Sequence, residues 1–202
     1  MLFEWSAECG ADDPVLVVPW SSDPSDPAGA SRFIDLREDP DATEEIAEAE
    51  RHPPLLHALR ALNAPRSPLF TAKCDAWSTT EPEVLNELRL HLDLAPEEAR
   101  AGFTSYIDLI WRDRNLFASF HQHEHLLHRL ARRVAPVDAP YALLDCIIRP
   151  ALLDLDAPQE GFATTLYVKA LGSGEQTALD NWGSALEAAV AILRSRDLTP
   201  NT

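Results

Sequence analysis

The stretch PLFTAKCDAW, residues 68–77, carries the clearest strand pattern in the chain. Its apolar or small residues alternate with polar ones, so the side chains of a strand here would point by turns to the two faces of a sheet. The first series is Phe70, Ala72, Cys74 and Ala76, and the second is Thr71, Lys73 and Asp75. A strand with one apolar and one polar face is typical of an antiparallel sheet that is covered on one side only.

Toward the C-terminus the sequence predicts a hairpin and a final helix. Residues 143–154 and 161–172 are apolar segments separated by a polar turn, a pattern that favours two antiparallel strands. Ser173 and Gln176 then have the spacing of a capping box, and large apolar residues recur at helical spacing as far as Leu193.

The remaining segments complete a fold prediction. Strands are predicted at 2–6, 14–20 and 33–37, and helices at 41–62 with a break at Pro53, from about 82, from about 96 to 110, and at 114–134. Because strands and helices come in runs without strict alternation, we predict an α+β fold. The expected architecture is a largely antiparallel (mixed) sheet of about five to six strands with helices packed on one face. It would form a single domain over 1–202, with an exposed loop at 21–31 and a flexible tail at 196–202.

Composition limits the partners. The chain has 202 residues and a formal net charge of −16, which would repel polyanions, so we expect no nucleic acid and no membrane as a partner. Three widely spaced cysteines without a metal-binding spacing indicate reduced thiols in a cytoplasm. The N-terminus lacks the pattern of a signal peptide, and arginine-rich, alanine-rich coding suggests a bacterial source. No cofactor-binding motif is recognised, so we expect no cofactor.

Only two of the 17 basic residues are lysines, and both lie in predicted strands. Lys73 shares a strand face with Asp75, and Lys169 shares one with Tyr167, so these four residues are the candidate ligand-binding set. If their strands were neighbours, the two lysines would meet on one polar–aromatic sheet face, although a solvated face with ordinary cross-strand pairs explains the same residues. The leading interpretation is a non-catalytic binding or interaction module that self-associates or binds a small-molecule or protein ligand through this face. The alternative is a small-molecule enzyme that uses Lys73 and Lys169 as acid/base or nucleophilic groups.

A histidine-rich segment offers a third interpretation, a metal-binding protein. His121 and His125 are four residues apart on the predicted helix at 114–134, the spacing that lets two imidazoles share a metal ion, and His128 lies near them. No HExxH motif or further ligand is evident, and surface histidines explain the pattern equally well. His123 falls on the apolar side and is predicted to be an interior histidine. Arg112 and Arg114 could clamp a carboxylate or form helix-end ion pairs with their neighbours.

Overall fold

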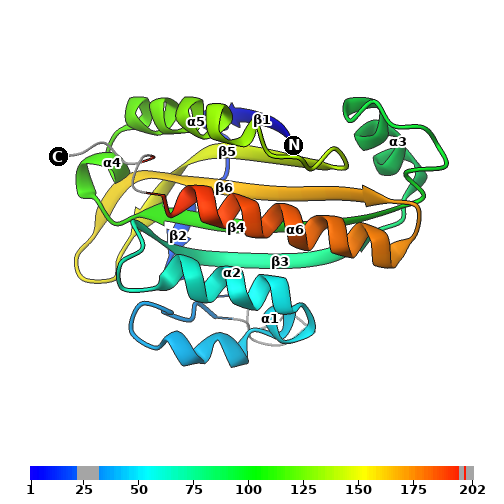
Figure 1. Ribbon diagram of the computed structural model, residues 1–202. Coiled ribbons are helices and arrows are strands. Elements are labelled where there is room, and N and C mark those ends of the chain that lie inside the picture. The colour runs from blue at the N-terminus through cyan, green and yellow to red at the C-terminus, as the bar shows by residue number, and fades with distance from the viewer. Residues whose placement is uncertain (22–31, 196–197, 199–202) are drawn as a thin grey trace.

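The computed structural model describes residues 1–21, 32–195 and 198, and these form a six-stranded, mostly antiparallel mixed sheet with helices (Figure 1), which confirms the predicted α+β fold. The strand order is β1-β5-β6-β4-β3, and β2 also pairs with β5. The two N-terminal strands run parallel to β5, and the other neighbours are antiparallel. The strands are β1 (Leu2–Ala7), β2 (Leu16–Val18), β3 (Leu69–Thr79), β4 (Ala101–Trp111), β5 (Ala142–Leu153) and β6 (Gln159–Gly172).

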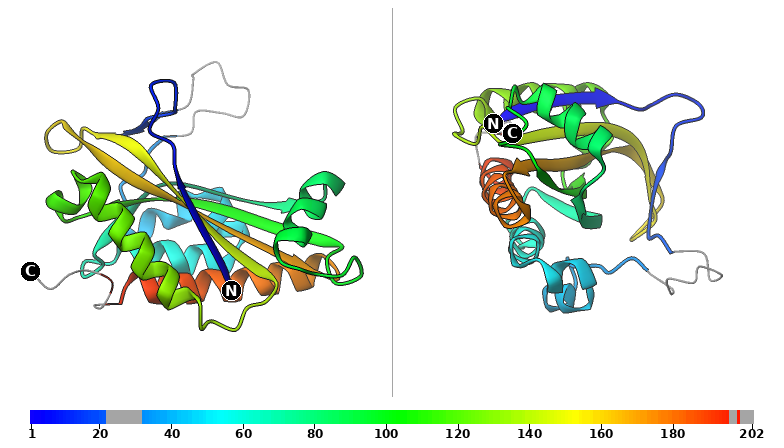
Figure 2. Two further views of the ribbon diagram at one scale, coloured as in Figure 1. Left: turned by 90° about the horizontal axis from the view of Figure 1, so that it is seen from above. Right: turned by 90° about the vertical axis from the view of Figure 1, so that its right-hand side faces the viewer.

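Three of the helices, α2, α5 and α6, cover one face of this sheet, which is seen from the side in the right panel of Figure 2. Asp39 caps the 3₁₀ helix η1 by accepting a hydrogen bond from the Asp41 backbone, and Pro40 occupies the first position of the helix. The helices are η1 (Pro40–Glu45), α1 (Ala47–Arg51), α2 (Pro53–Asn63), α3 (Pro82–His91), α4 (Arg114–Phe117), α5 (Phe120–Val134) and α6 (Glu175–Leu193).

The main core lies between this helical layer and the sheet. Ile107, Leu144 and Leu166, from three neighbouring strands, are completely buried beneath the helices. Trp182 of α6 is also fully buried, and its indole N–H donates to the Ser105 hydroxyl at 2.9 Å. The buried indole therefore keeps its hydrogen-bond partner, which burial of a polar group requires.

The opposite face is apolar at both ends and polar between them. At one end β2 lies over a small cluster that includes Val18, Phe70 and Ile110. At the other end α3 packs against Leu143 and Leu171. This face is here called the open face. Its middle is not covered by the helical layer and carries polar side chains.

Two sequence predictions were wrong. The helix predicted at about 96–110 is largely β4, in which alternate residues from Ala101 to Trp111 face the helical layer. The strand predicted at 33–37 is a turn, because the Asp35 carboxylate binds both the backbone N–H and the guanidinium of Arg37. Such local side-chain bonds to the backbone compete with pairing in a sheet.

Smaller differences concern the ends of elements. The predicted strand at 14–20 pairs only over Leu16–Val18. Helix α6 begins after Gly174, with no side-chain cap, so the predicted capping box at Ser173 does not form. The predicted loop lies outside the described residues apart from Ser21, which bridges to Arg32.

Of the predicted tail at 196–202, only Leu198 is among the described residues. Its side chain is 1% exposed and its carbonyl accepts a hydrogen bond from Arg129, so this residue is packed into the core. Within the described part of the chain, none of the helices has the length and apolar character needed to cross a membrane.

Candidate functional site

The middle of the open face holds a band of polar and aromatic side chains, here called the polar centre. In the register of the sheet, Tyr106 lies opposite Tyr167, and Tyr167 lies opposite Asp145. The two tyrosine rings are in contact, with centroids 5.8 Å apart. The polar centre comprises Thr104, Tyr106 and Asp108 of β4, Asp145 of β5, and Thr165, Tyr167 and Lys169 of β6.

Asp108 is the most buried carboxylate of the polar centre. It is 5% exposed and accepts a 2.6 Å hydrogen bond from the Thr165 hydroxyl. Burial raises the pKa of the Asp108 carboxyl, against the opposing effects of that hydrogen bond and of the charges on Arg149 and Lys73. Asp108 was not recognised from the sequence as an open-face residue, because residues 96–110 were predicted to form a helix.

The two lysines lie on the same face but do not share a site. The ammonium of Lys169 forms an ion pair with Asp145 at 2.8 Å and lies 5.4 Å from the Tyr167 ring centroid. The ammonium of Lys73 lies over the Trp20 ring, 5.2 Å from its centroid.

The assumption that their strands are neighbours was wrong, because β4 lies between β3 and β6. The register shift in β3 places Lys73 next to Asp108 on β4. Asp108 is opposite Thr165 on β6, and Lys169 lies four residues further along β6. From ordinary strand spacing and rise, the two lysine Cα atoms are roughly 16 Å apart. The two ammonium groups therefore do not form the shared site that the sequence suggested, and each has its own neighbours.

A hollow of about 700 Å³ opens beside Lys73, here called the β3 hollow. It lies between β3 and the segment formed by η1 and α1, which runs along the same edge of the sheet (Figure 1). The Trp20 indole N–H donates to the Ala72 carbonyl at 2.8 Å, and this bond holds one aromatic wall against the strand. The side chains that carry charge or an aromatic ring here are Trp20, Arg32, Glu45, Glu48, Arg51, Lys73, Asp75 and Tyr106.

The chemistry of these walls favours binding over nucleophilic attack. Burial, followed by the nearby charge of Asp108, raises the pKa of Tyr106, so its hydroxyl stays protonated at neutral pH and can donate a hydrogen bond. Burial likewise raises the pKa of the Cys74 thiol to about 12, which keeps it from forming a thiolate. Two of the predicted residues, Lys73 and Asp75, line the hollow, whereas Tyr167 and Lys169 belong to the polar centre behind it.

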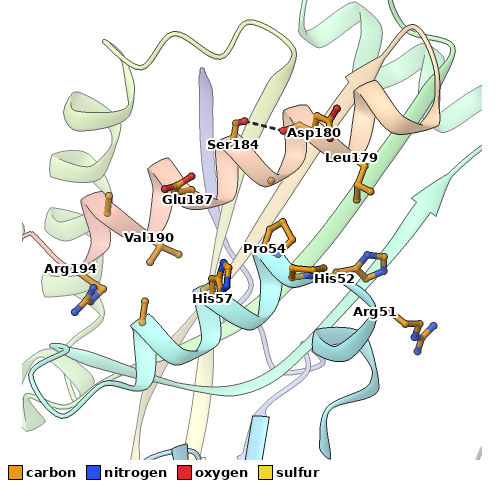
Figure 3. A pocket seen from close by; sticks show the side chains of 15 residues that line it. Arg51, His52, Pro54, His57, Leu179, Asp180, Ser184, Glu187, Val190 and Arg194 are labelled. Atoms are coloured by element: carbon orange, nitrogen blue, oxygen red, sulfur yellow. Dashed lines mark hydrogen bonds between the residues drawn. The ribbon is translucent and has the colours of Figure 1, made fainter. Parts of the chain in front are cut away.

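A second hollow, of about 690 Å³, lies between α2 and α6 (Figure 3) and meets the β3 hollow at Arg51, which lines both. His57 projects from α2 into the space facing α6, while Arg51 and Arg194 lie at opposite ends. Ser184 is already engaged, because its hydroxyl donates to the Asp180 carbonyl at 3.0 Å. The charged groups are spread along the rim and do not converge, so this groove is a weaker candidate for a specific ligand.

The structure brings together two of the three predicted histidines and places the third elsewhere. His121 and His125 lie together, with their Nε2 atoms 3.0 Å apart, but the His128 ring packs against Trp5 with centroids at 5.4 Å. His123 is 1% exposed, and burial lowers its pKa, as expected for an interior histidine. In the described residues no cluster of three or more His, Cys, Asp and Glu side chains is arranged to hold a metal ion.

The arginines after β4 line a smaller hollow of about 230 Å³ together with Arg37. The Arg112 guanidinium donates to the backbone carbonyls of Leu69 and Asn63 and lies 5.7 Å from the Phe70 ring centroid. These bonds tie Arg112 to the end of β3, so part of its hydrogen-bonding capacity serves the fold and not a carboxylate clamp.

Searches of protein-family models, curated protein sequences and solved structures gave no match to this chain. The function therefore has to be argued from the chemistry of the site itself.

Proposed function

We propose that this protein is a non-catalytic binding module that holds a small molecule in the β3 hollow. The observation that carries the proposal is the hollow itself: its volume of about 700 Å³ falls in the usual size range of ligand pockets. Its aromatic walls, Trp20 and Tyr106, provide apolar contact area, and polar groups stand beside them.

The charges beside these walls define the class of ligand. Lys73 and Asp75 are two residues apart on β3, and neither forms an ion pair with another side chain in the described part of the chain. One can bind a carboxylate and the other a cationic group, so the expected ligand is an amphipathic zwitterion with an aromatic or aliphatic body. Glu48 and Arg51, which form their own ion pair at 3.2 Å, add no net charge to the hollow.

A non-catalytic role is favoured because the groups needed for covalent chemistry are not assembled. Lys73 and Lys169 are separated by β4, and the raised pKa of Cys74 disfavours a thiolate. The alternative of a lysine-based enzyme thus loses the shared site on which it depended.

Three related probes test the proposal: tyrosine, tyramine and 4-hydroxyphenylacetate, which share an aromatic ring but carry both charges, only the cation, or only the anion. We expect tyrosine to bind tightest in calorimetry. Lys73→Gln should weaken tyrosine and 4-hydroxyphenylacetate about tenfold and spare tyramine, because one charged hydrogen bond contributes about 1.5 kcal/mol. Asp75→Asn should weaken tyrosine and tyramine instead.

Lys169→Gln is the matched control, since Lys169 lies on the same face but outside the hollow. Its affinity for all three probes should stay within about twofold of the original. Equal affinity of every variant for every probe, or no binding at all, would remove the proposal.

Self-association is a second candidate, supported by the edge of the sheet. β3 ends the sheet, and Trp77 near its end is 39% exposed. Two copies could pair along the part of this edge near Trp77 and extend the sheet, since η1 and α1 lie beside Thr71 to Asp75. Light scattering after size exclusion tests this: a dimer that Trp77→Lys dissociates supports it, and a monomer at high concentration contradicts it.

We also infer a reducing compartment, the bacterial cytoplasm. Cys9, Cys74 and Cys146 are all free thiols, and such thiols persist where glutathione and thioredoxin keep them reduced. The net charge of −16 supports the expectation that neither nucleic acid nor an anionic membrane is a partner.

A further inference from the structure

We propose that His121 and His125, in the first two turns of α5, form a two-histidine site for a divalent late transition metal ion. The site lies on the exposed side of α5, separate from the β3 hollow, and does not depend on the function proposed above. The two Nε2 atoms are 3.0 Å apart and the ring centroids 4.3 Å apart.

This separation matches what a shared metal ion requires. Imidazole nitrogens bind such ions at about 2.0–2.1 Å, so two of them on one ion at a bond angle of 90–109° lie about 2.9–3.4 Å apart. The pair therefore needs little rearrangement to chelate. Holding ligands in place before binding lowers the entropy that binding costs.

Glu124 orients one of the two rings. Its carboxylate lies 3.2 Å from Nδ1 of His121, so His121 carries its proton on Nδ1 and presents the Nε2 lone pair toward His125. A carboxylate behind a metal-binding histidine is the usual arrangement, because it fixes the tautomer and strengthens the ligand.

His125 supplies the proton of the short contact when no metal is bound. Since Nε2 of His121 has no proton, Nε2 of His125 donates across the 3.0 Å contact. On binding, His125 changes to the tautomer protonated on Nδ1, and both Nε2 atoms then face the ion. Both rings are exposed, so this change buries no charge.

The metal class follows from the ligands. Imidazole is a good ligand for Cu²⁺, Ni²⁺ and Zn²⁺. A site with two imidazole nitrogens should bind Cu²⁺ most tightly of the three, following the general affinity order of these ions. With no third side-chain ligand among the described residues, water or buffer completes the coordination.

The test uses untagged full-length protein carrying Cys9→Ser, because the exposed Cys9 thiol would bind the same metals. CuCl₂, NiCl₂ and ZnCl₂ are titrated separately in calorimetry, and copper binding is also followed by electron paramagnetic resonance. We expect one Cu²⁺ per chain with two nitrogen ligands, and weaker Ni²⁺ and Zn²⁺ binding.

His121→Ala and His125→Ala should each weaken Cu²⁺ binding about 100-fold, and Glu124→Gln about tenfold, the range seen when partners of a ligand are removed. His128→Ala is the control on the same helix, because its ring packs on Trp5 and lies outside the pair; it should change binding less than twofold. Exposed His121 and His125 can be replaced without opening the core, and circular dichroism checks the fold. The proposal fails if no copper binds, if His121→Ala binds like the parent, or if His128→Ala loses as much.

Discussion

The two faces of this sheet are built from the same strands and differ in what they bury. On the helix-covered face, neighbouring residues such as Ile107 and Leu166 are fully buried among apolar side chains, and buried polar groups such as those of Trp182 and Ser105 bond to each other. On the open face the next residues along the same strands are Asp108 and Tyr167. Consecutive residues of one strand therefore alternate between the apolar core and the polar centre.

Stability and binding should therefore reside on different faces of the sheet. Apolar burial stabilises by about 25 cal/mol per Å², and the main core lies on the helix-covered face, so this face should carry most of the free energy of folding. The polar centre and the β3 hollow should tolerate substitution better, because the loss of their side chains opens no cavity in the main core. Each prediction below tests this division.

The largest effect is expected at Trp182. Trp182→Ala removes a completely buried ring that packs against Phe103 with centroids 4.6 Å apart. The free energy of unfolding should fall by about 3–5 kcal/mol, as for other large-to-small core changes. Urea denaturation measures this free energy, and a loss below about 1 kcal/mol would contradict the view that the helix-covered face carries most of the stability.

A smaller effect is expected at the ion pair of the polar centre. Lys169→Gln leaves the Asp145 carboxylate without its 2.8 Å partner, and the two side chains are only 29% and 21% exposed. We expect a loss of about 1 kcal/mol, above the usual contribution of a fully exposed pair. The double variant with Asp145→Asn should recover part of the loss in the same urea assay. If the double variant loses as much free energy of unfolding as the two single variants added together, a direct interaction is contradicted.

The pH dependence of stability tests the burial of Asp108. Burial raises the folded-state pKa of Asp108 above its unfolded value, so the folded protein keeps a proton that the unfolded chain has released. Stability from this group is therefore greatest below about pH 4 and declines as pH rises through the folded pKa.

Asp108→Asn removes that decline. The variant should gain stability relative to the parent as the pH of urea denaturation is raised from 4 to 7. A difference that is independent of pH, or one that moves in the opposite direction, would show that the carboxylate is not desolvated in the folded state.

The smallest effect on stability is expected at Lys73. Lys73→Gln changes an exposed side chain whose described contact is the Trp20 ring, so the free energy of unfolding should change by less than about 0.5 kcal/mol. Thermal denaturation without ligand measures this. A large loss would mean that Lys73 serves the fold, and its proposed role toward a ligand would then need another explanation.

The sequence was sufficient for the fold class and for the hairpin of β5 and β6. It failed at β4 because Phe103, Tyr106, Ile107 and Ile110 recur at helical spacing, while the small Ala101 and Ser105 hide the alternation that a strand requires. Ala101 and Ser105 face the helical layer even though neither is a large hydrophobe.

The candidate site could be predicted only in part for a different reason. Lys73 and Asp75 both line the hollow, but the register shift in β3 breaks the predicted alternation, since Ala72 packs on the open face and Ala76 packs with the helical layer. Strand order in turn depends on long-range pairing that no local pattern records. The insertion of β4 between the lysine-bearing strands separated the expected pair. Trp20 also could not be foreseen in the hollow, because its contact with Ala72 spans 52 positions of the chain.

The most direct test of the account is to map ligand contact by amide chemical shifts. Tyrosine is titrated into isotope-labelled protein, and the amides of Ala72 to Asp75 and of Tyr106 are followed beside those of His57 and Ser184 in the groove between α2 and α6. We expect saturable shifts along β3 and at Tyr106, with the amides of the α2 and α6 groove unchanged. Shifts confined to the α2 and α6 groove would contradict it.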